Sequence, residues 1–129
     1  MKHFLLIACA LSFAAHAEVT MQTLSLPMRD GVKLATDTYR DDSVNQAPVL
    51  LTRTPYDRTR AKANAERWAK AGYIVVIQDC RGTRASEGAT APYNNEGQDG
   101  YDTIEWIAQQ PWCNGRIGMM GASYVGAVQ

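Results

Sequence analysis

The sequence predicts an α/β protein with a largely parallel sheet and flanking helices. Short apolar segments of strand length alternate with stretches of helical periodicity, and an Asp-Gly pair separates the first two segments. Hydrophobic residues make up 46% and charged residues 20% of the 129 residues, which is the balance of an ordinary globular protein. Right-handed crossovers would place the two predicted helices on the faces of the sheet.

Residues 1–17 are expected to be a secretory signal peptide. Lys2 is followed by an almost wholly apolar stretch, and Ala15-His16-Ala17 fits the A-x-A cleavage rule, so cleavage is expected before Glu18. The alternatives are a buried N-terminal helix and a lipoprotein box ending at Cys9, before which the apolar region is short. This interpretation leaves residues 18–129 in a periplasmic or secreted protein.

The first half of the remaining chain predicts a hairpin and a buried strand. Residues 20–28 alternate loosely between apolar and polar types, as in a half-buried strand, and residues 33–39 form the second strand. Between them, Asp30-Gly31 favours a tight turn. The apolar run 48–52 is typical of a strand that is buried on both faces.

The second half predicts helix, strand, helix and strand. A helix is expected over 59–71 with Gly72 past its end, followed by a strand over 73–78 and a long connection over 81–95. A second helix is expected over 97–110, and a short strand over 116–120. The apolar face expected for the second helix consists of Tyr101, Ile104, Ile107 and Ala108, with Trp106 on its flank.

The last strand leads into Gly121-Ala122-Ser123-Tyr124-Val125-Gly126, which has the composition of a nucleophile elbow. A sharp strand-to-helix turn strains the serine backbone and therefore requires small neighbours. Val125 stands where the commoner G-x-S-x-G pattern has its second glycine. The alternative is a glycine-rich turn with a structural serine.

Several further motifs occur in a fixed order along the chain. They are Thr54-Pro55-Tyr56-Asp57-Arg58, Gln78-Asp79-Cys80-Arg81-Gly82, Ser86-Glu87-Gly88, Glu96-Gly97, Asp99-Gly100-Tyr101-Asp102, Gln110-Pro111-Trp112 and Asn114-Gly115. With the elbow, this series resembles the cocaine esterase, α-amino-acid ester hydrolase and Xaa-Pro dipeptidyl-peptidase family from about residue 28 to residue 129. The resemblance implies the N-terminal part of an α/β-hydrolase fold, a mostly parallel sheet with flanking helices, truncated just after the nucleophile elbow.

Three site residues follow from the resemblance. Ser123 matches the family's acyl-accepting nucleophile, the amide of Tyr124 matches one oxyanion-hole donor, and the hydroxyl of Tyr56 matches the other. A phenol suits this task because it donates a hydrogen bond without adding a charge. On sequence alone, Tyr56 would be interpreted as an ordinary half-buried loop tyrosine, and only the resemblance favours the oxyanion-hole role.

The family's catalytic Asp and His follow the serine in the chain and have no counterpart here. The two histidines, at positions 3 and 16, lie in the expected signal peptide. Asp79, Asp99 and Asp102 precede Ser123, so structural roles are expected for them. Arg81 and Glu87 either line the rim of the site or form structural ion pairs and loop hydrogen bonds.

No metal or cofactor is expected. Cys80 follows a strand at one edge of the predicted sheet and Cys113 precedes a strand at the other edge, so two free thiols are predicted. No His, Cys and carboxylate cluster has the spacing of metal ligands. Trp68, Trp106 and Trp112 are expected to be packing residues rather than substrate platforms.

The expected function is that of a serine hydrolase that cleaves ester, amide or Xaa-Pro peptide bonds of small molecules or short peptides through an acyl-enzyme. Thirteen basic and thirteen acidic side chains cancel, which argues against nucleic acid as a partner. No apolar run reaches the ~18–20 residues of a membrane span. The alternatives are a non-catalytic truncated fragment that lacks the triad Asp and His, and a hydrolase-like protein whose serine is only structural.

Overall fold

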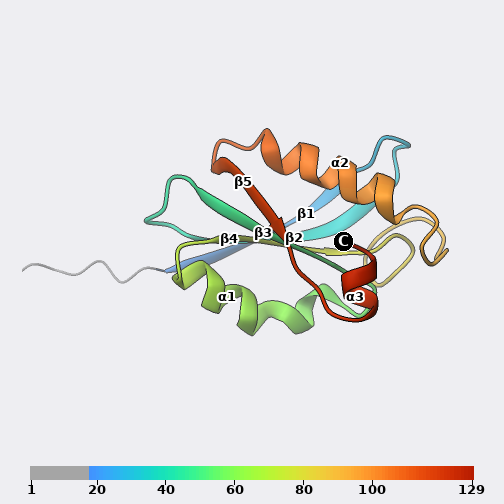
Figure 1. Cartoon of the computed structure of the whole chain (residues 1–129), viewed down its shortest axis with the longest axis horizontal. Helices are drawn as coiled ribbons and strands as arrows, with labels where there is room; N and C mark the ends of the chain where they lie inside the picture. The colour runs from blue at the N-terminus through green and yellow to red at the C-terminus, as the bar shows by residue number, and fades with distance from the viewer. Residues whose placement is uncertain (1–17) are drawn as a thin grey trace, which may run out of the picture.

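The computed structural model describes residues 18–129, which form one five-stranded sheet with a helix on each face (Figure 1). The expected signal peptide, residues 1–17, lies outside the described residues. The strands are β1 (Val19–Pro27), β2 (Lys33–Asp41), β3 (Ala47–Thr54), β4 (Ile74–Asp79) and β5 (Cys113–Met119). The helices are η1 (Arg58–Ala61), α1 (Lys62–Lys70), α2 (Glu96–Ala108) and α3 (Tyr124–Ala127).

The sheet has the strand order β1-β2-β4-β3-β5 and is mixed. β1 and β2 form the predicted antiparallel hairpin, whose turn places Gly31 at φ 85°, a conformation that glycine adopts without steric cost. β2 is antiparallel to β4, whereas β3 is parallel to both β4 and β5. The parallel part therefore brings the carboxyl ends of β3, β4 and β5 to one edge of the sheet.

The core lies on both faces of β4, in which every residue is buried. Ile74 and Val76 face α2 and pack in one cluster with Ile107. Val75 and Ile77 face α1 and pack in a second cluster with its buried alanines. α1 and α2 therefore cover opposite faces, as right-handed crossovers predict (Figure 1).

β3 is less completely covered than the sequence predicted. Val49 and Leu51 are fully buried, but Pro48, Leu50 and Thr52 on the other face are only partly covered. The expectation of burial on both faces was therefore wrong. A run of apolar residues does not reveal how far α1 extends over the far side of a strand.

The first helical segment begins at its predicted position but opens with a 3₁₀ turn. Asp57 caps this turn, because its side chain accepts hydrogen bonds from the amide and hydroxyl of Thr59 at 2.9 and 2.7 Å. α1 follows and ends at Lys70, and Gly72 lies just beyond it at φ 92°.

α2 buries a different face from the one predicted. Ile107 is buried and Ile104 is partly buried, as expected, but Tyr101 is 57% exposed and Ala108 is also exposed. The buried positions of α2 are Asp99, Gly100, Thr103 and Ile107. The N-terminal half of α2 packs on a buried arginine and glutamine rather than on an apolar surface, so apolar periodicity alone could not identify the buried face.

Candidate active site

Ser123 lies between β5 and α3 in a strained backbone conformation. Its φ of 56° and ψ of −130° place a non-glycine residue in a sparsely populated region, at a cost of about 1–3 kcal/mol. Its side chain is at an exposed position, and the chain turns sharply there from strand into helix (Figure 1). This is the backbone geometry that an elbow imposes on its nucleophile.

Two glycines close the turn around Ser123. A Cβ atom at Gly121 would lie 2.4 Å from the carbonyl oxygen of Val125, and one at Gly126 would lie 3.0 Å from the carbonyl oxygen of Gly121. The backbone on the two sides of the serine is therefore in direct contact, and side chains at these two positions would separate it. Val125, which stands where the commoner pattern has its second glycine, lines a neighbouring hollow.

Tyr56 lies beside the elbow, although 66 residues separate it from Ser123 in the chain. It follows β3, and its ring meets that of Tyr124 edge to face, with the centroids 6.0 Å apart. The Tyr56 side chain is 52% exposed, and its backbone amide donates a hydrogen bond to Thr54 Oγ1 at 3.1 Å. The structure therefore brings Tyr56 next to the turn that carries Ser123 and Tyr124.

Tyr93 is a third tyrosine at this position and was not predicted from the sequence. Its ring packs against that of Tyr124 at a centroid distance of 4.8 Å and an interplanar angle of 41°. Tyr93 is 59% exposed, and its φ of 67° is unusual for a non-glycine residue. It lies in the long connection between β4 and α2, where no local pattern distinguished it from other loop residues.

The surroundings of Tyr124 disfavour ionisation of its hydroxyl. Desolvation raises the pKa of this phenol above its usual range, and the nearby Tyr93 and Glu96 add to the effect. A tyrosine is already uncharged near neutral pH, and this environment extends the uncharged state of Tyr124 to more alkaline pH.

Two adjoining hollows lie next to the elbow on the α1 side of the sheet. The first has a volume of about 310 Å³ and is mostly apolar, and the second, of about 260 Å³, extends to Tyr56. They share Thr52, Ala61, Asn64 and Val125. The turn thus borders a concave surface that could hold part of a small substrate.

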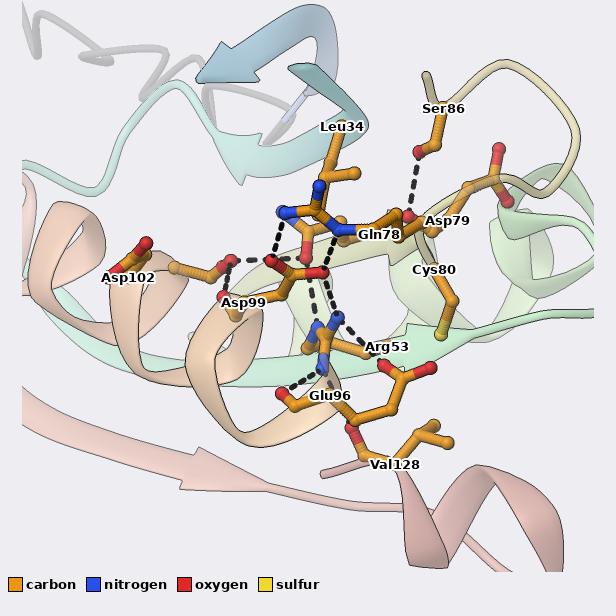
Figure 2. Close-up of polar contacts among 12 residues, drawn as sticks. Leu34, Arg53, Gln78, Asp79, Cys80, Ser86, Glu96, Asp99, Asp102 and Val128 are labelled. Atoms are coloured by element: carbon orange, nitrogen blue, oxygen red, sulfur yellow. Dashed lines mark hydrogen bonds and ion pairs between the residues drawn. The ribbon is translucent and has the colours of Figure 1, made fainter. Parts of the chain in front are cut away.

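A fully buried arginine, Arg53, connects Val128, which follows α3, to β4 and to the start of α2 (Figure 2). Its Nε donates a hydrogen bond to Gln78 Oε1 at 2.9 Å, and its Nη1 donates to the carbonyl oxygens of Glu96 and Val128 at 2.8 and 3.0 Å. The sequence analysis did not identify Arg53. One signal was available, because Arg53 has the same strand parity as the buried Val49 and Leu51.

The acidic residues that precede the serine form structural ion pairs. Asp79 is fully buried and pairs with Arg58 at 2.8 Å, and Asp37 also contacts this arginine at 3.0 Å. Asp102 pairs with Arg29 at 2.6 Å, across the surface near β1. These contacts match the structural roles expected from the sequence.

Arg81 and Glu87 also have structural contacts. Arg81 pairs with Asp99 at 2.7 Å and with Asp30 at 2.8 Å. Glu87 accepts a hydrogen bond from the backbone amide of Lys33 at 3.1 Å. Of the two interpretations given for these residues, the structure favours ion pairs and loop hydrogen bonds over a role at the rim of the site.

The two cysteines of the described residues are free, as predicted, and both are buried. Burial, assisted by the Glu96 carboxylate, raises the pKa of the Cys80 thiol to about 12. This thiol is therefore protonated at neutral pH and is not a nucleophile. Trp68, Trp106 and Trp112 pack partly buried against the two main core clusters.

Residues 18–129 contain no group of three or more His, Cys, Asp or Glu side chains placed to hold a metal ion. Within the same range, no helix has the length and apolar character needed to cross a bilayer. Residues 18–129 also contain no histidine that could act as the general base. The two histidines of the sequence, at positions 3 and 16, lie outside the described residues.

Comparison with known proteins agrees with this geometry. The model of the X-Pro dipeptidyl-peptidase (S15 family) matches residues 30–129. The cocaine esterase of Rhodococcus sp. (strain MB1 Bresler) is 46% identical over 110 residues, which are 81% of this chain and 19% of the esterase. The chain thus spans about a fifth of the length of that relative.

Solved structures give the same result. An α-amino acid ester hydrolase has a TM-score of 0.77 at 30% identity, covering 98% of this chain and 24% of the hydrolase. An aminopeptidase from the marine sediment archaeon Thaumarchaeota archaeon also has a TM-score of 0.77, at 29% identity, covering 98% of this chain and 25% of the peptidase. The fold is that of α/β-hydrolases, and the chain belongs to the X-Pro dipeptidyl-peptidase (S15) family of hydrolases.

Proposed function

We propose that this chain carries the nucleophile and the oxyanion hole of a serine hydrolase. The observation that supports the proposal most directly is the positive φ of Ser123, in a turn that Gly121 and Gly126 close by backbone contact. A strained serine costs stability, and such strain clusters at active sites. The packing of Tyr56 against Tyr124 adds a phenol beside the same turn.

In the proposed mechanism, Ser123 Oγ attacks the carbonyl carbon of an ester or amide and transfers its proton to a general base. The backbone amide of Tyr124 and the hydroxyl of Tyr56 donate hydrogen bonds to the resulting oxyanion. The bond to the leaving alcohol or amine then breaks, and the leaving group takes the proton from the base. Water hydrolyses the acyl-enzyme, which releases a carboxylic acid and restores the serine.

The general base and its orienting carboxylate would come from outside residues 18–129. The acidic residues near the site are already engaged, as in the pair of Asp79 with Arg58. We therefore propose a Ser, Asp, His order along the complete protein, as in other α/β-hydrolases. No step of this mechanism requires a metal or an organic cofactor.

The proposed substrates are small esters or amides and short peptides, including Xaa-Pro peptides. The relatives named above act on cocaine, on α-amino acid esters and on peptides, according to their names. The exposed tyrosines and the apolar hollow are compatible with each of these classes. We also propose that the protein is exported, on the pattern of residues 1–17.

The test is fluorophosphonate labelling of the complete protein that contains this chain, in the periplasmic or secreted fraction of the source cells. Peptide mapping should locate the label on Ser123, and Ser123→Ala should abolish both labelling and ester turnover. Ser25→Ala, at an exposed serine in β1, is the matched control and should retain both. Turnover that survives Ser123→Ala would support a structural serine, and an unlabelled native product would support the non-catalytic alternative.

A further inference from the structure

Arg53 is a buried charge that the proposed chemistry does not use. It lies in β3, three residues before Tyr56, and its side chain has no exposed surface. A buried guanidinium is costly unless ion pairs and hydrogen bonds compensate its lost hydration. Its contacts therefore indicate what the charge holds in place.

A first set of contacts holds the Arg53 side chain against β4 and α2. Nε donates to Gln78 Oε1 in β4 at 2.9 Å, and Nη1 donates to the carbonyl oxygen of Glu96 in α2 at 2.8 Å. Nη2 lies 3.0 Å from the Glu96 carboxylate and 3.8 Å from that of Asp99. Figure 2 shows the guanidinium between the start of α2 and β4. Its position is thus fixed independently of the elbow.

The contacts of a second set join Arg53 to the segment that follows Ser123. Nη1 donates to the carbonyl oxygen of Val128 at 3.0 Å. The backbone amide of Arg53 donates to Gln129 Oε1 at 3.1 Å, and Gln129 Nε2 donates to the backbone carbonyl of Arg53 at 2.9 Å. The same Nε2 also donates to the carbonyl oxygen of Val125. Both the side chain and the backbone of one residue therefore anchor residues 125–129.

Both proposed halves of the oxyanion hole depend on this anchor. Tyr56 lies three residues after Arg53, just past the end of β3, and the Tyr124 amide opens the segment that Val128 and Gln129 tie to Arg53. We propose that Arg53 is a positioning residue, which sets the separation between the Tyr56 hydroxyl and the Tyr124 amide. This inference rests on the proposed function, because it concerns the geometry of that same site.

The competing interpretation is that the Arg53 network only stabilises the fold. Loss of stability lowers the number of folded active sites but leaves each remaining site unchanged. A displaced oxyanion hole instead lowers the rate at every site, since a misplacement of about 1 Å can cost about 100-fold. The two interpretations therefore differ in rates that are expressed per active site.

The experiment uses the complete protein with two variants, Gln129→Ala and Arg53→Lys. Gln129→Ala removes the amide pairing and leaves the buried charges balanced, so this variant is the one expected to fold. Arg53→Lys keeps the charge but cannot make the forked contacts to Gln78, Glu96 and Val128. Arg81→Lys is the matched control, because Arg81 also pairs with Asp99 and makes no hydrogen bond or ion pair to residues 121–129.

Active sites are counted by stoichiometric fluorophosphonate labelling, and kcat and KM are measured per labelled site with 4-nitrophenyl acetate. The inhibition constant of phenylboronic acid supplies the second readout, because its tetrahedral adduct places an oxygen in the oxyanion hole. We expect both variants to lower kcat about tenfold or more, raise the inhibition constant in parallel and leave KM within about twofold. Arg81→Lys should leave all three values unchanged per site.

The outcomes separate this inference from the proposed function. A wild-type protein that is not labelled at Ser123 overturns both. A labelled wild type whose variants keep kcat and the inhibition constant per site overturns only the role of Arg53. If Arg53→Lys does not fold, Gln129→Ala alone decides, because its normal kcat would contradict the proposal and its lowered kcat would support it.

Discussion

Replacing Gly121 by alanine is expected to open the turn that holds Ser123. The new Cβ would lie 2.4 Å from the carbonyl oxygen of Val125, 2.6 Å from its carbonyl carbon and 2.8 Å from the amide nitrogen of Gly126. These are backbone atoms, so rotation of a side chain cannot relieve the overlap. The two sides of the turn must therefore move apart.

The size of the effect follows from these distances. Ordinary contact begins at 3.4 Å, so the backbone at Gly121 and Val125 must separate by about 1 Å, a displacement that costs about 100-fold in rate. This loss corresponds to about 2.7 kcal/mol in activation free energy. At Gly126 the overlap is smaller, with a Cβ 3.0 Å from the carbonyl oxygen of Gly121, so Gly126→Ala should lose about tenfold.

The assay measures kcat/KM for 4-nitrophenyl acetate in the complete protein, together with the melting temperature. Gly118→Ala in β5 is the control, because its Cβ would meet only Leu50 Cδ2 at 3.7 Å, which is ordinary contact. The expected order of loss is Gly121→Ala, then Gly126→Ala, then Gly118→Ala with a change of less than about twofold. A Gly121→Ala variant with kcat/KM within about threefold of wild type would show that separating Gly121 from Val125 does not displace Ser123.

Three further predictions concern single groups. Tyr56→Phe keeps the ring contact with Tyr124 but removes the hydroxyl. In steady-state ester hydrolysis, kcat should therefore fall about 100- to 1000-fold with little change in KM. An unchanged kcat would exclude the phenol as an oxyanion donor. Burial raises the pKa of the Cys80 thiol to about 12. Iodoacetamide at about pH 8 should therefore leave Cys80 unmodified in the native protein and alkylate it in urea, as measured by peptide mass spectrometry. Alkylation of Cys80 in the native protein would contradict its burial. The hydrogen bond from Arg29 lowers the pKa of Asp102, so its stabilising contribution is present above the unfolded-state pKa of about 3.9 and is lost as pH falls through the lower folded-state pKa. Urea unfolding from about pH 5 to about pH 2 should therefore show a smaller loss of stability for Asp102→Asn than for wild type, and equal losses would argue against the ion pair.

Local pattern predicted most of the fold. The Asp30-Gly31 turn, the order of strands and helices and the end of α1 near Gly72 are all close to the observed structure. These features depend on neighbouring residues, through turn chemistry and side-chain periodicity. The pairing of β2 with β4 and the placement of β4 between β2 and β3 depend on long-range contacts, and the sequence analysis did not specify them.

The buried face of α2 shows why the remaining features could not be predicted. Apolar periodicity assigned Tyr101 to this face, but Tyr101 is exposed beside Arg29, whose guanidinium lies 5.6 Å from the ring centre. Gly100 and Thr103 are among the buried positions of α2. Gly100 allows Arg53 to approach the helix closely, and the hydroxyl of Thr103 donates a hydrogen bond to Gln78 Oε1. A polar cluster inside a protein is recognisable only when all its members are placed in space.

The turn around Ser123 could be predicted without the fold, because small neighbours and the change from strand to helix are properties of consecutive residues. Through the family's motifs the sequence also indicated Tyr56, which the structure places against Tyr124. The contacts that hold this site together could not be predicted in the same way. Arg53 looks like an isolated charge in a strand until the fold surrounds it with acceptors from β4, α2 and the segment after Ser123. A charge can be buried only where such partners converge, and their convergence is a property of the folded chain.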